Sequence, residues 1–363
     1  MMAHPSTGPL TPSAAVARPA SSLRLAADWA WAAGALLLFA GLSVALGAVP
    51  IPLAMVVKAL VAALSFRALP AGLPETYTTI LYQIRLPHTA LVALTGMALA
   101  GSGAAYQGLF RNPLADPYII GVASGAGLGA VVAMALHWPT TLLGAAAIPL
   151  AAFVGAMLTV GAVVQIARVG RTTPVTTLIL AGVGIGSFMS AATSLIMLTS
   201  TDQLHRAIGW MLGGFSLGGW KPVLASLPYL VVGLSVLSLL GRQLDVLQFG
   251  DEQALQLGLD VERVKLVVVV AASLVAATAV AFSGIIGFVG LIVPHIGRLL
   301  WGTDYRRLIP LAVLGGGAAL LGADILARTV LAPRVIPVGI VTAILGAPFF
   351  LWLLRRAKQV WHW

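Results

Sequence analysis

Residues 266–283 read LVVVVAASLVAATAVAFS and contain no charged side chain. A helix needs about 20 predominantly apolar residues to cross the hydrocarbon core of a bilayer. Comparable stretches recur at residues 29–49, 89–108, 117–136, 142–167, 174–199, 222–241, 306–327 and 337–354. A shorter stretch at 287–301 contains Pro294 and is expected to form a tilted or partly broken helix. The sequence therefore predicts an all-α membrane protein with about ten transmembrane helices.

The composition argues against a soluble fold. Of the 363 residues, 59% are hydrophobic and 9% are charged, whereas a typical soluble domain has about 25% charged residues. The formal net charge of +10 does not indicate nucleic-acid binding, because the basic residues flank the apolar stretches of the sequence. The absence of cysteine excludes disulfides, thiolate metal ligands and cysteine nucleophiles.

The N-terminal residues predict the orientation of the chain. Residues 1–28 are rich in Pro, Ala and Ser and are expected to form a disordered cytoplasmic tail, followed by one transmembrane domain over 29–363. Basic residues concentrate in the cytoplasmic loops of membrane proteins. When the predicted spans alternate sides from this tail, 14 of the 21 Lys and Arg residues fall on the cytoplasmic side. The pattern predicts a multi-pass protein with both termini in the cytoplasm.

Two further patterns concern helix packing and ATP. Gly121, Gly125 and Gly129 recur every four residues in the third predicted span, and such a face lets two helix backbones approach closely. We interpret these three residues as a helix-packing surface. The chain contains no G-x-x-x-x-G-K-[ST] motif, the loop that cradles nucleotide phosphates in many ATPases. Any ATP that drives this protein is therefore expected to be bound by a separate subunit.

The connection at residues 242–265 is the most charged stretch in the body of the chain. Asp251 and Glu252 favour the start of a short helix, because carboxylates complement the positive end of the helix dipole. Gly258 can end that helix in a left-handed conformation, and Asp260 is expected to start a second short helix. A stretch this polar must face water or a partner protein.

Several long segments carry a resemblance to a known family. The first lie between residues 83 and 129, where Asp116 is also expected to cap the third span, and the others lie near the C-terminus. The segments are QIRLPHT (83–89), YQGLFRNPLADP (106–117), GVASGAGLG (121–129), FSGIIGFVGLIVPHIGR (282–298), GADILAR (322–328) and PVGIVTAILGAPFF (337–350). They closely resemble the permease subunits of type II ABC importers for ferric siderophores, haem and cobalamin.

The resemblance implies a ten-span transport subunit of the bacterial inner membrane that is not itself an enzyme. It implies a second copy of the chain, two cytoplasmic ABC ATPase subunits and a periplasmic substrate-binding protein as partners. The transported metal chelate and membrane lipid complete the list, and neither a cofactor nor a protein-bound metal is expected. The missing phosphate loop agrees with a separate ATPase.

The resemblance also implies two working surfaces. In the family, two short helices dock in a groove of the ATPase, and the matching residues here are Asp251, Glu252, Ala254, Leu255, Leu257, Gly258 and Leu259. In the cobalamin branch, exposed arginines pair with the binding protein at positions that correspond to Arg85 and Arg328. A third arginine is expected where this chain has His88, so this part of the docking pattern departs from the family.

The cargo and the energy source leave alternatives open. An iron chelate, either haem or a ferric siderophore, is the favoured cargo, and cobalamin is the alternative. An ion-coupled secondary transporter would normally carry acidic residues within its spans, and only Asp324 lies clearly inside one. A membrane enzyme is disfavoured, because the spans lack a Ser and Lys pair or an H-E-x-x-H helix.

Overall fold

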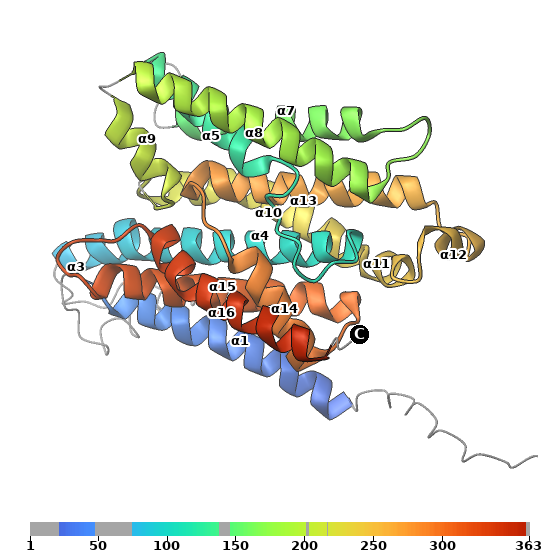
Figure 1. Cartoon of the computed structure of the whole chain (residues 1–363). Coiled ribbons are helices and arrows are strands. Elements are labelled where there is room, and N and C mark those ends of the chain that lie inside the picture. The colour runs from blue at the N-terminus through green and yellow to red at the C-terminus, as the bar shows by residue number, and fades with distance from the viewer. Residues whose placement is uncertain (1–21, 48–74, 138–145, 201–202, 216, 361–363) are drawn as a thin grey trace, which may run out of the picture.

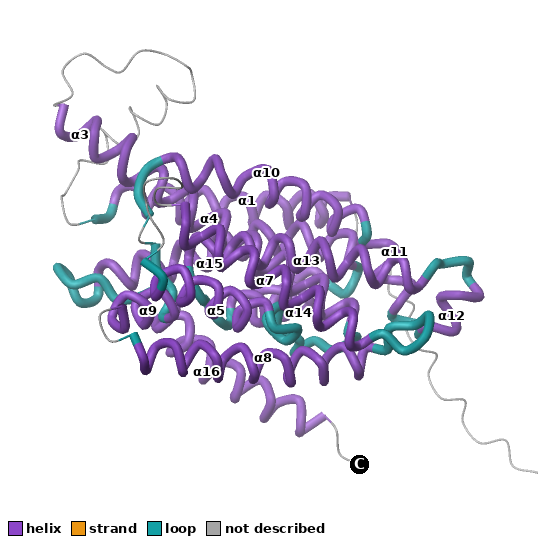
Figure 2. The backbone as a smooth tube through the Cα atoms, turned by 90° about the horizontal axis from the view of Figure 1, so that it is seen from above, coloured by secondary structure: helices purple, strands orange, loops and turns teal. Residues whose placement is uncertain are grey.

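The computed structural model describes residues 22–47, 75–137, 146–200, 203–215 and 217–360, and within these ranges it contains helices and no β-strand (Figure 1). Most helices run side by side along one direction. The short helix α12 projects beyond them at one end, in both the front view and the view from above (Figures 1 and 2).

The prediction of about ten transmembrane helices is confirmed. Seven helices are long and apolar enough to cross a membrane: α1 (Ser22–Ala45), α4 (Leu86–Leu109), α7 (Ala147–Ala167), α8 (Val175–Thr199), α10 (Trp220–Leu239), α13 (Val261–Ser283) and α15 (Tyr305–Thr329). Three further apolar helices are α5 (Val122–Ala135), α14 (Val289–Trp301) and α16 (Val338–Val360). The short helices are α3 (Glu75–Thr79), the π-helical turn η1 (Ile80–Arg85), α9 (Leu204–Met211), α11 (Gly241–Leu247) and α12 (Asp251–Gln256).

Helix α4 lies at the centre of the bundle and packs against α10, α13, α14 and α15. Small residues make these contacts close. A Cβ atom on Gly96 would collide with the backbone of Gly316 in α15, and one on Gly103 would collide with the backbone of Gly290 in α14. Because lipid supplies no hydrophobic drive between helices, this close van der Waals contact is what holds the bundle together.

The glycine face of α5 lies against α7. A Cβ atom on Gly125 would meet the backbone of Gly155, and one on Gly129 would meet the carbonyl oxygen of Ala151. Gly121 precedes the helix in a left-handed conformation, with φ of 85°. The α5 and α7 backbones are therefore as close as their glycines allow.

The chain breaks between α13 and α14, at residues 284–288. Gly284 and Phe288 both have positive φ, 68° and 70°, so the backbone cannot continue either helix there. The Tyr118 hydroxyl donates to the Ile286 carbonyl of this break at 2.9 Å, and the Gln107 amide donates to the Leu291 carbonyl in the first turn of α14 at 3.1 Å. Non-helical backbone at membrane depth requires partners of this kind within the protein. The irregularity expected within 287–301 therefore lies at its start, because α14 runs unbroken through Pro294 from Val289 to Trp301.

Three local expectations were wrong. Helix α1 begins at Ser22, so residues 22–28 are not part of a disordered tail, whereas residues 1–21 lie outside the described ranges. Asp116 does not cap α5 but accepts from the Tyr118 N–H at 2.8 Å within a turn. Asp260 caps the long helix α13 rather than a short one, by accepting from the Arg263 N–H at 3.1 Å. The second short helix of the charged connection is α11, which precedes α12.

The close approach of α5 and α7 gives a stability prediction. Gly129→Ala should lower the melting temperature of the detergent-solubilised chain, because overpacking typically costs about 1–3 kcal/mol. Gly127→Ala on the same helix is the matched control, since its Cβ atom would meet nothing within 4 Å. The control should melt at or above the wild-type temperature, because Ala favours a helix over Gly by roughly 0.5–1 kcal/mol. Equal melting temperatures for the two variants would contradict this packing.

Candidate functional site

The residues predicted to contact partner proteins lie at the two opposite ends of the bundle. The α12 end contains α11, α12 and the connection between α7 and α8 at residues 168–174. The Arg328 end contains Arg85, His88, Arg328 and the C-terminus of α1. Polar side chains at these ends can contact water or partner proteins, whereas side chains in the middle of the bundle face lipid or other helices.

At the α12 end, helix α12 presents apolar side chains to the outside. Leu255 and Leu257 are 59% and 68% exposed, although the segment carries charged neighbours. Gly250 and Gly258 have positive φ, 106° and 83°, and bracket the helix with tight turns. Two exposed leucines at the C-terminal end of a projecting helix form a contact surface that suits a protein partner.

The predicted coupling residues separate into two groups. Glu252, Leu255, Leu257 and Gly258 are exposed. Ala254 is fully buried, and Leu259 is half-buried against the core. The expectation that Ala254 contacts the ATPase directly was therefore wrong. The Ala254 methyl group anchors α12 to the bundle.

Asp251 anchors α12 through charge. Its carboxylate lies 2.6 Å from the Lys265 ammonium group of α13 and 3.3 Å from the Arg111 guanidinium group in the α4–α5 connection. Sequence reasoning missed both basic partners. The only local signal was the placement of Glu262 and Lys265 three residues apart on one helix, a spacing that favours an ion pair.

Helix α11 is fixed against the start of α15. The Asp245 carboxylate accepts from the Tyr305 N–H at 2.8 Å, and Gly241 lies against the backbone of Arg306. Burial raises the pKa of the Asp245 carboxyl to about 6. Because α11 is held in this way, the neighbouring α12 projects from a fixed base.

At the Arg328 end, two arginines cover the C-terminus of α1. Arg85 donates to the Val44 and Ala45 carbonyls at 2.8 and 3.0 Å, and Arg328 donates to the Leu46 carbonyl at 3.1 Å. The last carbonyls of a helix lack partners within the helix, and cations there also complement its dipole. These arginines therefore hold α1 in place.

Asp324 joins the other members of this cluster. Its carboxylate lies 2.8 Å from the Arg328 Nε atom and 3.0 Å from the His88 Nε2 atom. Arg328 also donates to the Ser43 hydroxyl at 3.0 Å. The structure thus brings Arg328 and His88 together, although they are far apart in sequence, through one carboxylate that is only 4% exposed.

The expectation of exposed docking arginines at these positions was wrong about their exposure. Arg85 is 7% exposed, and the Arg328 side chain is 17% exposed. Both arginines hold the C-terminus of α1, so a charge reversal at either position would disturb the fold as well as any docking. Arg206 and Arg334 are the exposed arginines at this end of the described chain.

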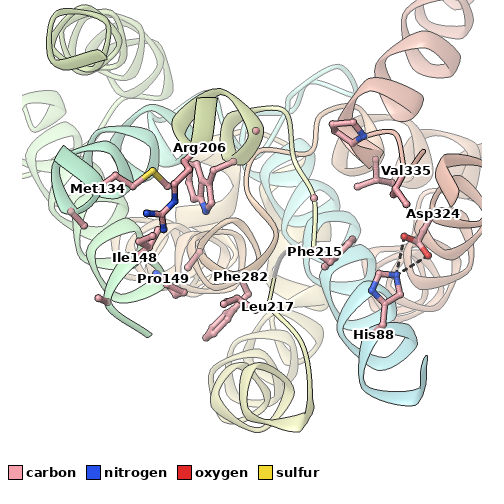
Figure 3. Close-up of a pocket in the computed structure, with 18 of the residues that line it drawn as sticks. His88, Met134, Ile148, Pro149, Arg206, Phe215, Leu217, Phe282, Asp324 and Val335 are labelled. Carbon is pink, nitrogen blue, oxygen red and sulfur yellow. Dashed lines mark hydrogen bonds and ion pairs between the residues drawn. The ribbon is translucent and has the colours of Figure 1, made fainter. Parts of the chain in front are cut away.

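A cavity of about 790 Å³ opens beside this cluster (Figure 3). Met134 and Ile148 line one wall with Arg206, and His88 and Asp324 lie on the opposite wall. Aromatic side chains, among them Phe215 and Phe282, lie between the two walls. The cavity can accommodate a bulky, partly apolar molecule that carries anionic groups.

A second cavity, of about 690 Å³, lies along α5 and α8. The α8 side of its lining consists mainly of small and hydroxyl-bearing residues, including Gly182, Gly186, Ser187, Ser190 and Ser194. The hydroxyls of Ser187 and Ser194 donate to carbonyls four residues earlier in α8. This face of α8 therefore lacks large side chains and is weakly polar, unlike the exposed leucines elsewhere on the helix. Among the described residues, no group of three His, Asp or Glu side chains could hold a metal ion.

Comparison with known proteins gives consistent matches. A family model described as the FecCD transport family matches residues 35–356. The cobalamin import system permease protein BtuC of Halobacterium salinarum is 46% identical over 78% of this chain and 75% of its own length. The hemin transport system permease protein HmuU of Yersinia pestis is 41% identical over 76% of this chain and 83% of its own length. A solved structure described as an inward-facing metal-chelate type ABC transporter has a TM-score of 0.77 and 27% identity, covering 91% of this chain and 99% of that one.

The cluster at the Arg328 end gives a prediction about stability. Arg328→Glu should lower the melting temperature of the solubilised chain by several degrees, because it leaves Asp324 beside a like charge, and loss of one partner of a buried pair costs on the order of 3 kcal/mol. Arg334→Glu makes the same change at an exposed position of the same end and should melt like the wild type. Unchanged melting of both variants would mean that Arg328 has no structural role.

Proposed function

The chain belongs to the FecCD transport family, and from that membership we propose that it is the membrane-spanning permease subunit of an ATP-binding-cassette importer for a metal chelate. The observation that carries the proposal is the exposed apolar pair Leu255, in the projecting helix α12, and Leu257, directly after it. A transporter without a phosphate loop of its own needs a protein surface through which an ATPase can act on it.

The orientation and partners follow from this role. We place the α12 end in the cytoplasm, where two ABC ATPase subunits bind, and the Arg328 end on the periplasmic side of a bacterial inner membrane. The distribution of basic residues supports this orientation. A substrate-binding protein docks at the Arg328 end, and the accessible arginines there are Arg206 and Arg334, with Arg85 and Arg328 supporting the surface from behind.

A second copy of the chain completes the translocation path. Glycine and hydroxyl-bearing residues along α8 suit close approach of another helix better than contact with lipid tails. Large apolar side chains on the same helix, such as Leu180 and Phe188 at 65% and 69% exposure, remain to be covered by lipid or by the partner. The second cavity then lies beside the path.

The cargo is proposed to be haem or a ferric siderophore. Arg206 and the apolar walls of the first cavity suit a bulky chelate with anionic groups. The Halobacterium relative is a cobalamin import system permease protein by name, so cobalamin is the alternative cargo. Titration of the cognate binding protein with haem, ferric siderophores and cobalamin separates these cargoes, and tight binding of cobalamin alone would overturn the iron-chelate assignment.

The exposed leucines of α12 give a prediction about assembly. Leu255→Asp should reduce co-purification of the ATPase subunit by about tenfold or more, because an unpaired carboxylate buried at the contact costs several kcal/mol. Leu331→Asp is the matched control, since Leu331 is 58% exposed, as Leu255 is at 59%, but lies at the Arg328 end. It should leave ATPase recovery unchanged.

Normal recovery of the ATPase with Leu255→Asp, together with normal transport, would show that α12 is not the contact. Loss of the ATPase with both variants would indicate a general folding defect rather than a lost contact. Melting temperatures of the two variants without the ATPase distinguish these outcomes.

A further inference from the structure

Lys265 is a nearly buried cation at the α12 end, with 6% of its surface exposed. Its ammonium group donates to Asp251 at 2.6 Å, to Glu262 at 3.3 Å and to the Thr173 carbonyl at 3.5 Å. An ammonium group has three N–H donors, so these acceptors use all of them. A buried cation without partners costs several kcal/mol, so the four residues behave as one unit.

The acceptors belong to different structural elements. Asp251 is the first residue of α12, Glu262 lies in the first turn of α13, and Thr173 lies in the connection that leads into α8. Glu262 also accepts from the Thr173 N–H at 2.7 Å. Lys265 and Glu262 together therefore hold the backbone at Thr173 from both its N–H and its carbonyl group. One unit thus connects the projecting helix to the start of α8.

Helix α12 has few other attachments to the bundle. Of its six residues, Ala254 is buried and Asp251 is half-buried, and the remaining four are exposed. The Asp251 carboxylate is therefore the main polar connection between α12 and the helices. A force applied at Leu255 and Leu257 reaches the bundle largely through Ala254 and Asp251.

We propose that Lys265 is a positioning residue that transmits movement of α12 to the start of α8, and so couples ATP hydrolysis by the partner to the translocation path. The proposal rests on the proposed function. Helix α8 lines the second cavity, so a displacement at Thr173 changes the wall of that cavity. Arg111 lies against the other carboxylate oxygen of Asp251. This second ion pair limits how far α12 can move independently of Lys265, Glu262 and Thr173.

The test uses the complete complex, with ATPase and binding protein, in proteoliposomes. Lys265→Met keeps the length of the side chain and removes the charge. It should retain the ATPase subunit while the amount of chelate transported per ATP hydrolysed falls by about tenfold, which is within the range of measured coupling effects. Lys265→Arg should restore part of the ratio. Wild-type transport per ATP in Lys265→Met would overturn the proposal.

Arg263→Met is the matched control. It removes the same charge from the same helix two residues earlier, where the side chain is exposed and faces away from Lys265. Its ratio of transport to hydrolysis should equal that of the wild type. A purely structural role of Lys265 would instead lower transport and ATP hydrolysis together and leave their ratio unchanged, and that result would also overturn the proposal.

A second pair of variants keeps the test decisive if Lys265→Met does not fold. Asp251→Asn and Glu262→Gln each remove one charged partner of Lys265. If both act through Lys265, the defect of the double variant should be close to that of the stronger single variant, because members of one unit are not additive. Defects that multiply would mean independent sites and would overturn the proposal. A wild-type complex without ATP-dependent uptake would instead refute the proposed function.

Discussion

Every backbone polar group within the lipid-facing part of this chain must find its partner inside the protein. The continuous helices meet this constraint with their own hydrogen bonds. The break between α13 and α14 meets it through Tyr118, which donates to the Ile286 carbonyl, and Gln107 donates to the Leu291 carbonyl in the first turn of α14. The α4–α5 region is drawn close to α14 by Gly103 and Gly290. The contacts that place hydrogen-bond donors beside the α13–α14 break are therefore the same contacts that pack the centre of the bundle.

Because the middle of the bundle is apolar and closely packed, the charged chemistry is confined to its ends. At one end, Asp324 gathers Arg328 and His88 beside the C-terminus of α1. At the other, Asp251 and Lys265 form an ion pair that attaches α12 to α13, beside the buried Ala254. An ATP-driven importer needs such an arrangement: a rigid interior, one end at which the cargo enters and one end that contacts the ATPase.

The sequence was sufficient for features that depend on local patterns. Apolar length predicted the ten helices, the spacing of Gly125 and Gly129 predicted a shared face, and Asp251 with Gly258 marked the two ends of α12. Features that depend on distant contacts were not predictable. Arg85 resembled an exposed arginine because nothing in its neighbourhood reveals that Val44 lies against it. Asp260 does start a helix, but that helix is the long α13, because a capping residue does not specify how long the following helix is. Asp116 lies in a turn before α5, because the same carboxylate can accept from a turn N–H as well as from a helix start.

The most direct test of the account is uptake by reconstituted liposomes. The chain together with its ATPase and binding protein should accumulate the chelate only when ATP is present on the α12 side. The purified chain alone should hydrolyse no ATP and transport nothing under a proton or sodium gradient, because its sequence contains no phosphate loop. Uptake by the chain alone, driven by such a gradient, would contradict the account.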